Sequence, residues 1–351
     1  MDLRLTPEQD QLVDAFVGLY SKHSTPEQVR ASEATGFDPE LWKRLADLGA
    51  VPMAVAEADG GWGASFLDLA LVAEQQGRFV AAAPIIEAQV AARLLAGLGA
   101  AGAEPLADAL AGDRLITFAP RPARGEVAEL VPAGAIAQDA VVLAGDRLLL
   151  VPLDDARTPV ENLASMPLAD VILPSTATVL AEGDAARSAH DHAVDEWMVL
   201  TGAALVGIAA RSLEIGVEYV TERMAWGVPI GTFQGISHRL ADSAAAIDGA
   251  RLLAYEAAWA RDDQPERAAE LAAMTFAFGY ETARDASYRS LHFHGGYGFM
   301  MEYDIQLYYR RSRGWANVLA DPEATYRRVA DHRYGPAGAS ATHAAAERAE
   351  G

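Results

Sequence analysis

Residues 222–234 read Glu-Arg-Met-Ala-Trp-Gly-Val-Pro-Ile-Gly-Thr-Phe-Gln and separate two long Ala-rich segments with helical periodicity. Gly227 and Pro229 are expected to end the first helix, because Gly is common after helix ends and Pro cannot continue a helix. Gly231 permits a further turn, and the helical pattern resumes near Ser237. The stretch therefore predicts a tight junction between two long helices.

This junction places a guanidinium and a side-chain amide close together in the sequence. Arg223 could form a two-pronged contact with a phosphate, and Gln234 could hydrogen-bond the edge of a cofactor. The alternative is an ordinary helical hairpin with an Arg at its solvated tip. The residues of this stretch alone leave both interpretations open.

A second segment, residues 291–299, reads Leu-His-Phe-His-Gly-Gly-Tyr-Gly-Phe. Gly295 and Gly296 would let the backbone approach a pyrophosphate closely, because neither residue has a Cβ. The alternative is a helix C-cap, where Gly is the usual residue. His292 precedes the pair and is a further candidate for contact with a cofactor.

Together, the pattern Arg-x-x-aromatic-Gly-x-Pro-Ile-Gly-x-Phe-Gln and the later Gly-Gly-x-Gly-Phe resemble the acyl-CoA dehydrogenase family. The resemblance covers most of the chain: residues 1–49 and 60–101 look like the family's N-terminal helical domain, and residues 199–330 look like its C-terminal bundle. In that family the first segment reaches across a subunit interface to the FAD of a neighbour. The resemblance implies that FAD is the cofactor and that the residues contacting it are Arg223, Trp226, Gln234, His292, Gly295 and Gly296.

Composition limits the possible partners. The 351 residues carry a formal net charge of −21, contain no cysteine and are 51% hydrophobic. Such acidity argues against nucleic acid or an anionic membrane as a partner. The absence of cysteine excludes disulfides and fits a cytoplasmic protein. We expect no signal peptide at Met1 and no apolar run long enough to span a bilayer.

The periodicity changes twice along the chain and predicts three domains. An N-terminal helical domain is expected over residues 1–112, a shortened β-domain over 113–190, a C-terminal four-helix bundle over 191–335 and a flexible tail over 336–351. The fold class is therefore mainly α with a small β-domain. The expected strands are the apolar runs 115–118, 140–143, 148–151 and 171–173. The long helices are expected over 193–221, 237–261 and 265–292.

The resemblance also implies a reaction, in which a carboxylate removes the α-proton of an acyl-CoA and a hydride moves from the β-carbon to FAD. The family takes this base from one of two positions, which Trp197 and Ala320 occupy here. Glu196 and Asp321 are the neighbouring fallback candidates. Glu196 is rotated by about 100° on its helix, and Asp321 before Pro322 is typical of a helix N-cap. We expect no carboxylate of this chain to be the catalytic base.

The β-domain also departs from the family. Phe118 stands where the strand motif Thr-Glu-Pro has Glu, and the segment that wraps the isoalloxazine ring is missing. The combination resembles the smaller subunit of heteromeric acyl-CoA dehydrogenases, in which a full-length partner subunit carries the base. The resemblance implies a heterotetramer, an acyl-CoA substrate with a bulky or steroid-derived acyl group, and an external electron acceptor. The alternatives are a self-sufficient homotetramer, with Glu196 or Asp321 as a relocated base, and a non-enzymatic scaffold.

A metal site is not expected. The run His190-Asp191-His192 has no third ligand at a fixed spacing, and its surroundings predict a solvated loop.

Overall fold

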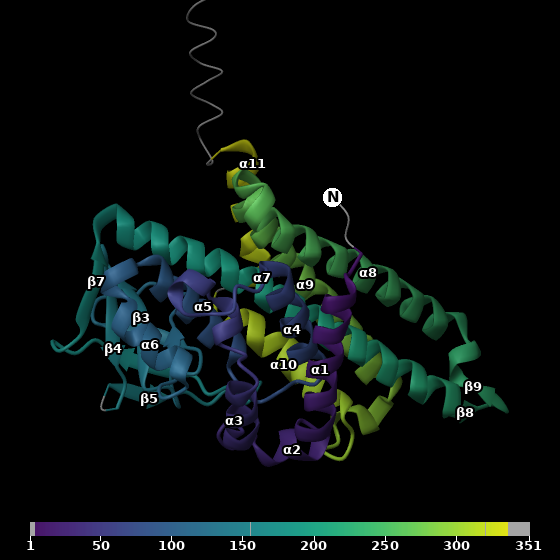
Figure 1. The fold of residues 1–351 in the computed structure, drawn as a ribbon. Helices are drawn as coiled ribbons and strands as arrows, with labels where there is room; N and C mark the ends of the chain where they lie inside the picture. The colour runs from purple at the N-terminus through teal and green to yellow at the C-terminus, as the bar shows by residue number, and fades with distance from the viewer. Residues whose placement is uncertain (1–3, 155, 320, 336–351) are drawn as a thin grey trace, which may run out of the picture.

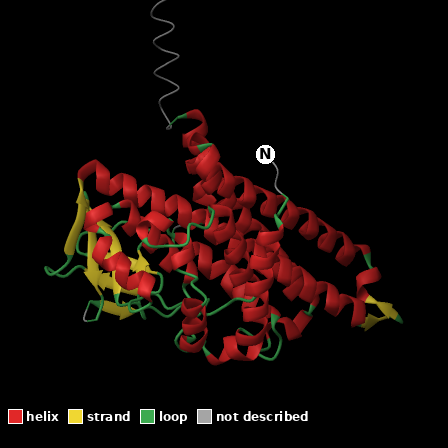
Figure 2. Ribbon diagram, viewed as in Figure 1, coloured by secondary structure: helices red, strands yellow, loops and turns green. Residues whose placement is uncertain are grey.

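The computed structural model describes residues 4–154, 156–319 and 321–335, and it arranges N-terminal helices, a β-domain and a C-terminal bundle around one long helix (Figure 1). The predicted class, mainly α with a small β-domain, is confirmed. The strands gather at one end of the molecule, and a small hairpin projects from the opposite end (Figure 2).

The N-terminal helices begin where the sequence supplies caps. The hydroxyls of Thr6, Thr25 and Ser65 accept hydrogen bonds from backbone N–H groups of the first turn, and Asp38 does so through its carboxylate. Such caps satisfy the N–H groups that have no partner within the helix. The helices are α1 (Pro7–His23), α2 (Pro26–Ala31), α3 (Pro39–Asp47), α4 (Phe66–Arg78), α5 (Ile85–Gly97) and α6 (Ala103–Ala111).

The β-domain consists of two small sheets. One has the strand order β1-β3-β4-β7, with β1 parallel to β3 and the other pairs antiparallel; the other has the order β2-β6-β5 and is antiparallel. All four predicted runs form strands, but three half-exposed strands were not predicted, because they lack a continuous apolar run. The strands are β1 (Ile116–Phe118), β2 (Val127–Val131), β3 (Asp139–Ala144), β4 (Arg147–Pro152), β5 (Arg157–Pro159), β6 (Ala169–Ile172) and β7 (Thr178–Glu182).

The central helix α7 (Gly183–Glu222) begins ten residues earlier than predicted. His190 and its two neighbours therefore lie within a helix, and the solvated-loop prediction is wrong. His190 is buried and donates from Nε2 to the carbonyl oxygen of Ala119 at 3.0 Å. The polar N-terminal part of α7 packs against β3, β4 and β7, and this packing stabilises a helix where the composition indicated a linker. The proposed domain boundary at residue 190 lies inside α7.

Helix α7 is long and apolar enough to span a membrane by length and composition. However, 72% of its apolar window is buried inside the molecule, as in the core helix of a folded domain. It packs against α4, α8 and α9 and runs from β7 to the hairpin at the far end (Figure 1).

Helix α7 is followed by the hairpin of β8 (Met224–Ala225) and β9 (Val228–Pro229), and the C-terminal bundle continues from there. Helix α8 begins at Gln234, three residues before the predicted start near Ser237, so the junction between the two long helices is shorter than predicted. The remaining helices are α8 (Gln234–Asp263), α9 (Pro265–Phe293), α10 (Ile305–Asn317) and α11 (Thr325–Tyr334). The predicted tail over 336–351 lies outside the described residues.

Candidate functional site

Two hollows along α7, one beside its middle and one at its C-terminal end, contain several of the residues singled out in the sequence. The first, which we call the outer groove, has a volume of about 600 Å³ and lies between the C-terminal ends of α7 and α9. Its lining includes Tyr219, Arg223, His294, Gly295 and Gly296. Arg223 and Gly295 are 72 positions apart in the sequence, and the fold brings both to this groove.

Arg223 directly follows the last residue of α7. Its backbone N–H donates to the carbonyl of Tyr219 at 2.9 Å, and its carbonyl accepts from Ile230 N–H at 2.8 Å, which closes the hairpin. Its side chain is exposed, and it makes no ion pair or side-chain hydrogen bond with any described residue. An unpaired guanidinium held at the edge of a groove is suited to bind an anionic group.

The paired glycines differ from the third glycine of their motif. A Cβ on Gly298 would lie 2.4 Å from the carbonyl oxygen of Leu291, so packing alone requires glycine there. A Cβ on Gly295 or Gly296 would meet nothing within 4 Å. Gly295 has a φ of +60°, which favours glycine, but Gly296 has no such constraint. Nothing in the described chain requires Gly296, so its open face is available to a ligand or partner.

Two groove residues were missed by the sequence analysis. His294 is buried and stacks on Tyr219, with ring centroids 4.0 Å apart and planes 23° apart. Burial lowers the pKa of His294, so its imidazole is held in the neutral form. The His-Gly-Gly run was a usable signal for His294, but Tyr219 could be placed beside it only by the fold.

The other predicted cofactor residues lie outside the lining of the groove. Trp226 is 91% exposed at the tip of the hairpin and packs edge-on against Phe233, with ring centroids 5.8 Å apart. Gln234 is exposed at the start of α8. His292 is exposed on α9 and stacks on Tyr288 at 5.9 Å.

The tip of the hairpin is strained as well as exposed. Trp226 has a φ of +49° and Gly227 a φ of +82°, which is the pattern of a type I′ turn. Such turns strongly favour Asn or Gly at the first position, where Trp is found here. A large exposed apolar side chain in an unfavourable backbone conformation is typical of a contact surface.

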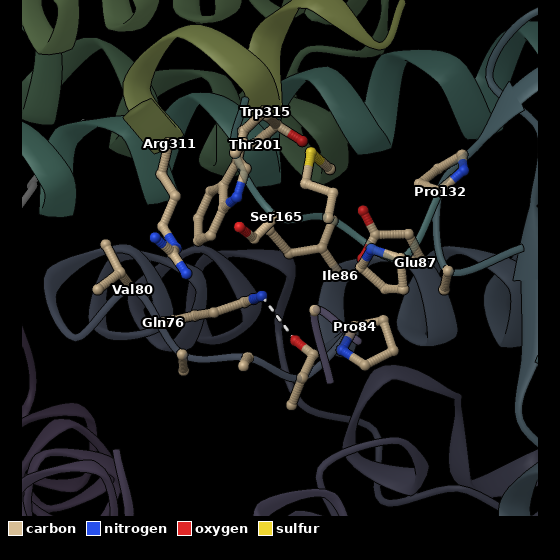
Figure 3. Close-up of a pocket in the computed structure, with 18 of the residues that line it drawn as sticks. Gln76, Val80, Pro84, Ile86, Glu87, Pro132, Ser165, Thr201, Arg311 and Trp315 are labelled. Atoms are coloured by element: carbon tan, nitrogen blue, oxygen red, sulfur yellow. Dashed lines mark hydrogen bonds between the residues drawn. The ribbon is translucent and has the colours of Figure 1, made fainter. Parts of the chain in front are cut away.

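The second hollow, which we call the inner cavity, lies between α4, α5, α7 and α10 (Figure 3). Its volume is only about 60 Å³, whereas sites for cofactor-sized ligands occupy roughly 300–1,000 Å³. Trp197 and Trp315 are the two largest side chains in its lining. Trp197 is 1% exposed, so its indole is part of the packed core.

The loop of residues 162–168 closes this cavity from the side of the β-domain. A Cβ on Gly314 of α10 would lie 2.1 Å from the Cβ of Ala164, so the loop rests directly on the helix. Arg310 donates to the carbonyl of Leu163 at 3.3 Å and to Ser165 Oγ at 3.4 Å. Helix α10 and this loop are therefore in direct contact beside the inner cavity.

Glu87 on α5 supplies a carboxyl group to the lining of the inner cavity and was also missed by the sequence analysis. Its Oε1 accepts a hydrogen bond from Trp197 Nε1 at 3.3 Å. Burial raises the pKa of Glu87, which favours the protonated form. The pair joins residues far apart in the chain and holds the Trp197 indole in place.

The fallback carboxylates do not line the inner cavity. Glu196 points away from it and forms ion pairs with Arg93 at 2.9 Å and Arg261 at 2.7 Å. Asp321 is exposed immediately before the short 3-10 helix Pro322–Ala324, and its carbonyl accepts from Ala324 N–H at 3.0 Å. Ala320 lies outside the described residues. Within the described chain, no group of acidic and His side chains has the arrangement of a metal site.

Comparison with known proteins places these features in a family context. Residues 6–104 match the acyl-CoA dehydrogenase N-terminal domain, and residues 196–316 match the acyl-CoA dehydrogenase C-terminal domain. The chain is 30% identical to acyl-CoA dehydrogenase IpdE2 of Mycolicibacterium smegmatis over 93% of its own length and 98% of the relative. It is 27% identical to IpdE2 of Mycobacterium tuberculosis, over 92% and 96% of the two chains.

Solved structures give the same result. A chain of the ChsE4–ChsE5 complex from Mycobacterium tuberculosis superposes with a TM-score of 0.85 at 26% identity, covering 96% of this chain and 100% of that one. A chain of the Tcur3481–Tcur3483 steroid ACAD G363A variant superposes with a TM-score of 0.84 at 26% identity, covering 93% and 97%.

Proposed function

Because this chain belongs to the acyl-CoA dehydrogenase family of FAD-dependent oxidoreductases, we propose that it is the supporting subunit of a heteromeric acyl-CoA dehydrogenase. In this proposal a full-length partner subunit carries the catalytic base and the ring-binding segment. This chain contributes the outer groove, which holds the phosphate and adenosine part of the partner's FAD. The substrate is a CoA thioester, and an external electron acceptor completes the reaction.

The observation that carries the proposal is the contrast between the two hollows. The inner cavity is too small for an isoalloxazine ring, because its volume is only about 60 Å³ and Trp197, Trp315 and residues 164–167 line it closely. The outer groove does fit an anionic, extended group, because it has an unpaired Arg223 and an uncovered Gly296. Arg223 also lies about 39 Å further along the helix than Trp197, so one cofactor cannot occupy both hollows of the same chain.

The roles of the residues follow from this contrast. FAD, when bound, supplies the hydride acceptor for the β-carbon of the thioester. Arg223 binds phosphate oxygens, and the open faces of Gly295 and Gly296 admit the pyrophosphate close to the backbone. Gln234 and His292 are further contacts from the neighbouring helices. Glu196 and Asp321 take no part in proton transfer.

The hairpin tip supports a subunit interface at this end of the molecule. Met224 is 54% exposed and Trp226 is 91% exposed. A partner that covers them would remove apolar surface from water, worth about 25 cal/mol per Å². A structural relative whose description names a steroid acyl-CoA dehydrogenase supports a steroid-derived acyl group as the substrate class.

The test is Arg223→Ala in the complex reconstituted with a full-length acyl-CoA dehydrogenase subunit. A hydrogen-bonded charge contact contributes about 1.5–3 kcal/mol, so FAD affinity should fall roughly tenfold or more. Arg147→Ala on β4 is the matched control, since Arg147 is also exposed but lies in the β-domain. Equal FAD affinity for the Arg223 variant and the wild type would contradict the proposal.

Gly296→Val provides a second, steric test. The structure leaves room for the new side chain, so the free chain should keep its helical circular-dichroism signal and its melting temperature. FAD binding by the complex should be abolished, because the valine would occupy the space of the pyrophosphate. Gly298→Ala is the folding control and should destabilise the chain itself. If the Gly296 variant bound FAD as tightly as the wild type, the assignment of the cofactor to this surface would be wrong.

A further inference from the structure

The outer groove contains a hydrogen-bond acceptor that the proposed function does not yet use. His294 follows the last residue of α9, and its ring is held from two sides. It stacks on Tyr219 at 4.0 Å and meets Tyr303 edge-on at 5.9 Å. An aromatic ring held in this way presents its nitrogen atoms in a fixed direction.

The hydrogen bonds of His294 determine its tautomer. Nδ1 lies 2.7 Å from the carbonyl oxygen of Ser290, and a carbonyl can only accept, so Nδ1 carries the proton. In the neutral ring Nε2 then has a free lone pair. Nε2 has no hydrogen-bond partner among the described residues. It is also not among the side-chain atoms that are both fully buried and unpaired, so it is not sealed off from solvent. Since His294 lines the outer groove, this lone pair is accessible from the groove.

We propose that His294 Nε2 recognises a hydrogen-bond donor on the nucleoside half of the bound FAD, either a ribose hydroxyl or the adenine amino group. This inference rests on the proposed function. Phosphate oxygens carry no proton near neutral pH and only accept, so a neutral imidazole acceptor disfavours them at this position. Arg223 is donor-only and favours them. Arg223 therefore binds the phosphates and His294 binds the nucleoside, and together they set the direction in which the cofactor lies in the groove.

Substitutions at His294 separate the acceptor from the structural roles of the ring. His294→Phe keeps the stack on Tyr219 and removes both nitrogen atoms. His294→Asn keeps a donor for the Ser290 carbonyl and removes the outward acceptor. His294→Gln is long enough to return an oxygen acceptor to the position of Nε2. Circular dichroism and melting temperature of each variant chain verify folding before binding is measured.

The measurement is the dissociation constant of FAD and of FMN for the reconstituted complex. Loss of one neutral hydrogen bond should weaken FAD about three- to tenfold in the Phe and Asn variants, with partial recovery in the Gln variant. FMN lacks the adenosine monophosphate half, so its affinity should be unchanged in all three. Unchanged FAD affinity in both the Phe and Asn variants, or equal losses of FAD and FMN, would overturn the inference.

Two further arms complete the design. Flavin hypoxanthine dinucleotide replaces the adenine amino group by a carbonyl oxygen. If the wild type binds this analogue more weakly than FAD, and His294→Asn causes no further loss, the donor is the adenine amine. If the wild type binds the analogue and FAD equally, and His294→Asn still weakens both, the donor is a ribose hydroxyl. Arg223→Ala is the reference. If Arg223→Ala weakens FAD and the His294 variants do not, only this inference fails, whereas FAD binding that is unaffected by both refutes the proposed function as well.

Discussion

At the scale of single residues, two neighbouring side chains of α7 face in different directions. Trp197 faces the inner cavity, and its neighbour Glu196 faces two arginines on the other side of α7. Adjacent helix positions differ by about 100°, so the Glu196 carboxylate and the Trp197 indole project from different sides of the helix. The structure also gives Glu196 a different role, since it joins α7 to α5 and α8 through Arg93 and Arg261.

Glu196→Gln should therefore affect stability and not catalysis. The amide keeps the shape of the side chain but weakens two charge-assisted contacts of a buried group, and the free energy of unfolding should fall by about 1–3 kcal/mol. Turnover by the reconstituted complex should change by less than a few-fold. Urea unfolding of the chain and steady-state kinetics of the complex measure the two effects.

Asp321→Asn is the matched control for this variant. Asp321 is exposed, and exposed charge contacts contribute little to stability, so the stability and the turnover of this variant should stay close to those of the wild type. A general base typically contributes about 10²–10⁴-fold to rate. A hundredfold loss of turnover in either variant, with flavin still bound, would make this chain the catalytic subunit.

At the scale of elements, the close approach of α4 and α7 organises the core. A Cβ on Gly77 would lie 1.8 Å from the carbonyl oxygen of Ala204, and a Cβ on Gly207 would lie 1.9 Å from that of Glu74. The backbones therefore touch, and this contact sets the direction in which α7 leaves the N-terminal helices. It positions Trp197 at one hollow and Arg223 at the other.

Gly77→Ala should destabilise the chain by about 1–3 kcal/mol or more, because backbone atoms of the partner helix cannot move as easily as a side chain. Gly97→Ala in α5 is the control, since the new methyl group would meet nothing within 4 Å. That substitution should be neutral or stabilise by up to about 1 kcal/mol, because alanine has less freedom in the unfolded chain. Thermal melts compare the two, and equal melting temperatures would contradict the assigned helix contact.

At the scale of the whole molecule, the small inner cavity and the open outer groove lie apart along α7, and under the proposed function we expect the chain not to hold a complete FAD by itself. The exposed hairpin tip and the groove lie at the same end of α7, so a partner that covers the tip also reaches the groove (Figure 1). Association and cofactor binding are therefore expected to depend on each other.

The chain purified alone should be colourless, and the complex with its full-length partner should be yellow with flavin absorbance. Size-exclusion chromatography with absorbance at the flavin band measures assembly and cofactor content in one experiment. A chain that is yellow alone and turns over substrate would indicate a self-sufficient enzyme. A chain that stays colourless with every full-length candidate would indicate a scaffold.

The sequence by itself determined the fold class, the four main apolar strands and the two segments that meet in the outer groove. These features depend on local periodicity, on capping residues such as Thr6 and Asp38, and on glycines with short-range conformational preferences. Only the tertiary structure decided that loop 162–168 closes the inner cavity, that Glu87 holds the Trp197 indole, and that His294 stacks on Tyr219. Each of those contacts joins residues far apart in the chain, and their geometry depends on how whole helices pack. The early start of α7 has the same cause, because packing against the sheet stabilises a helix that its composition alone does not predict.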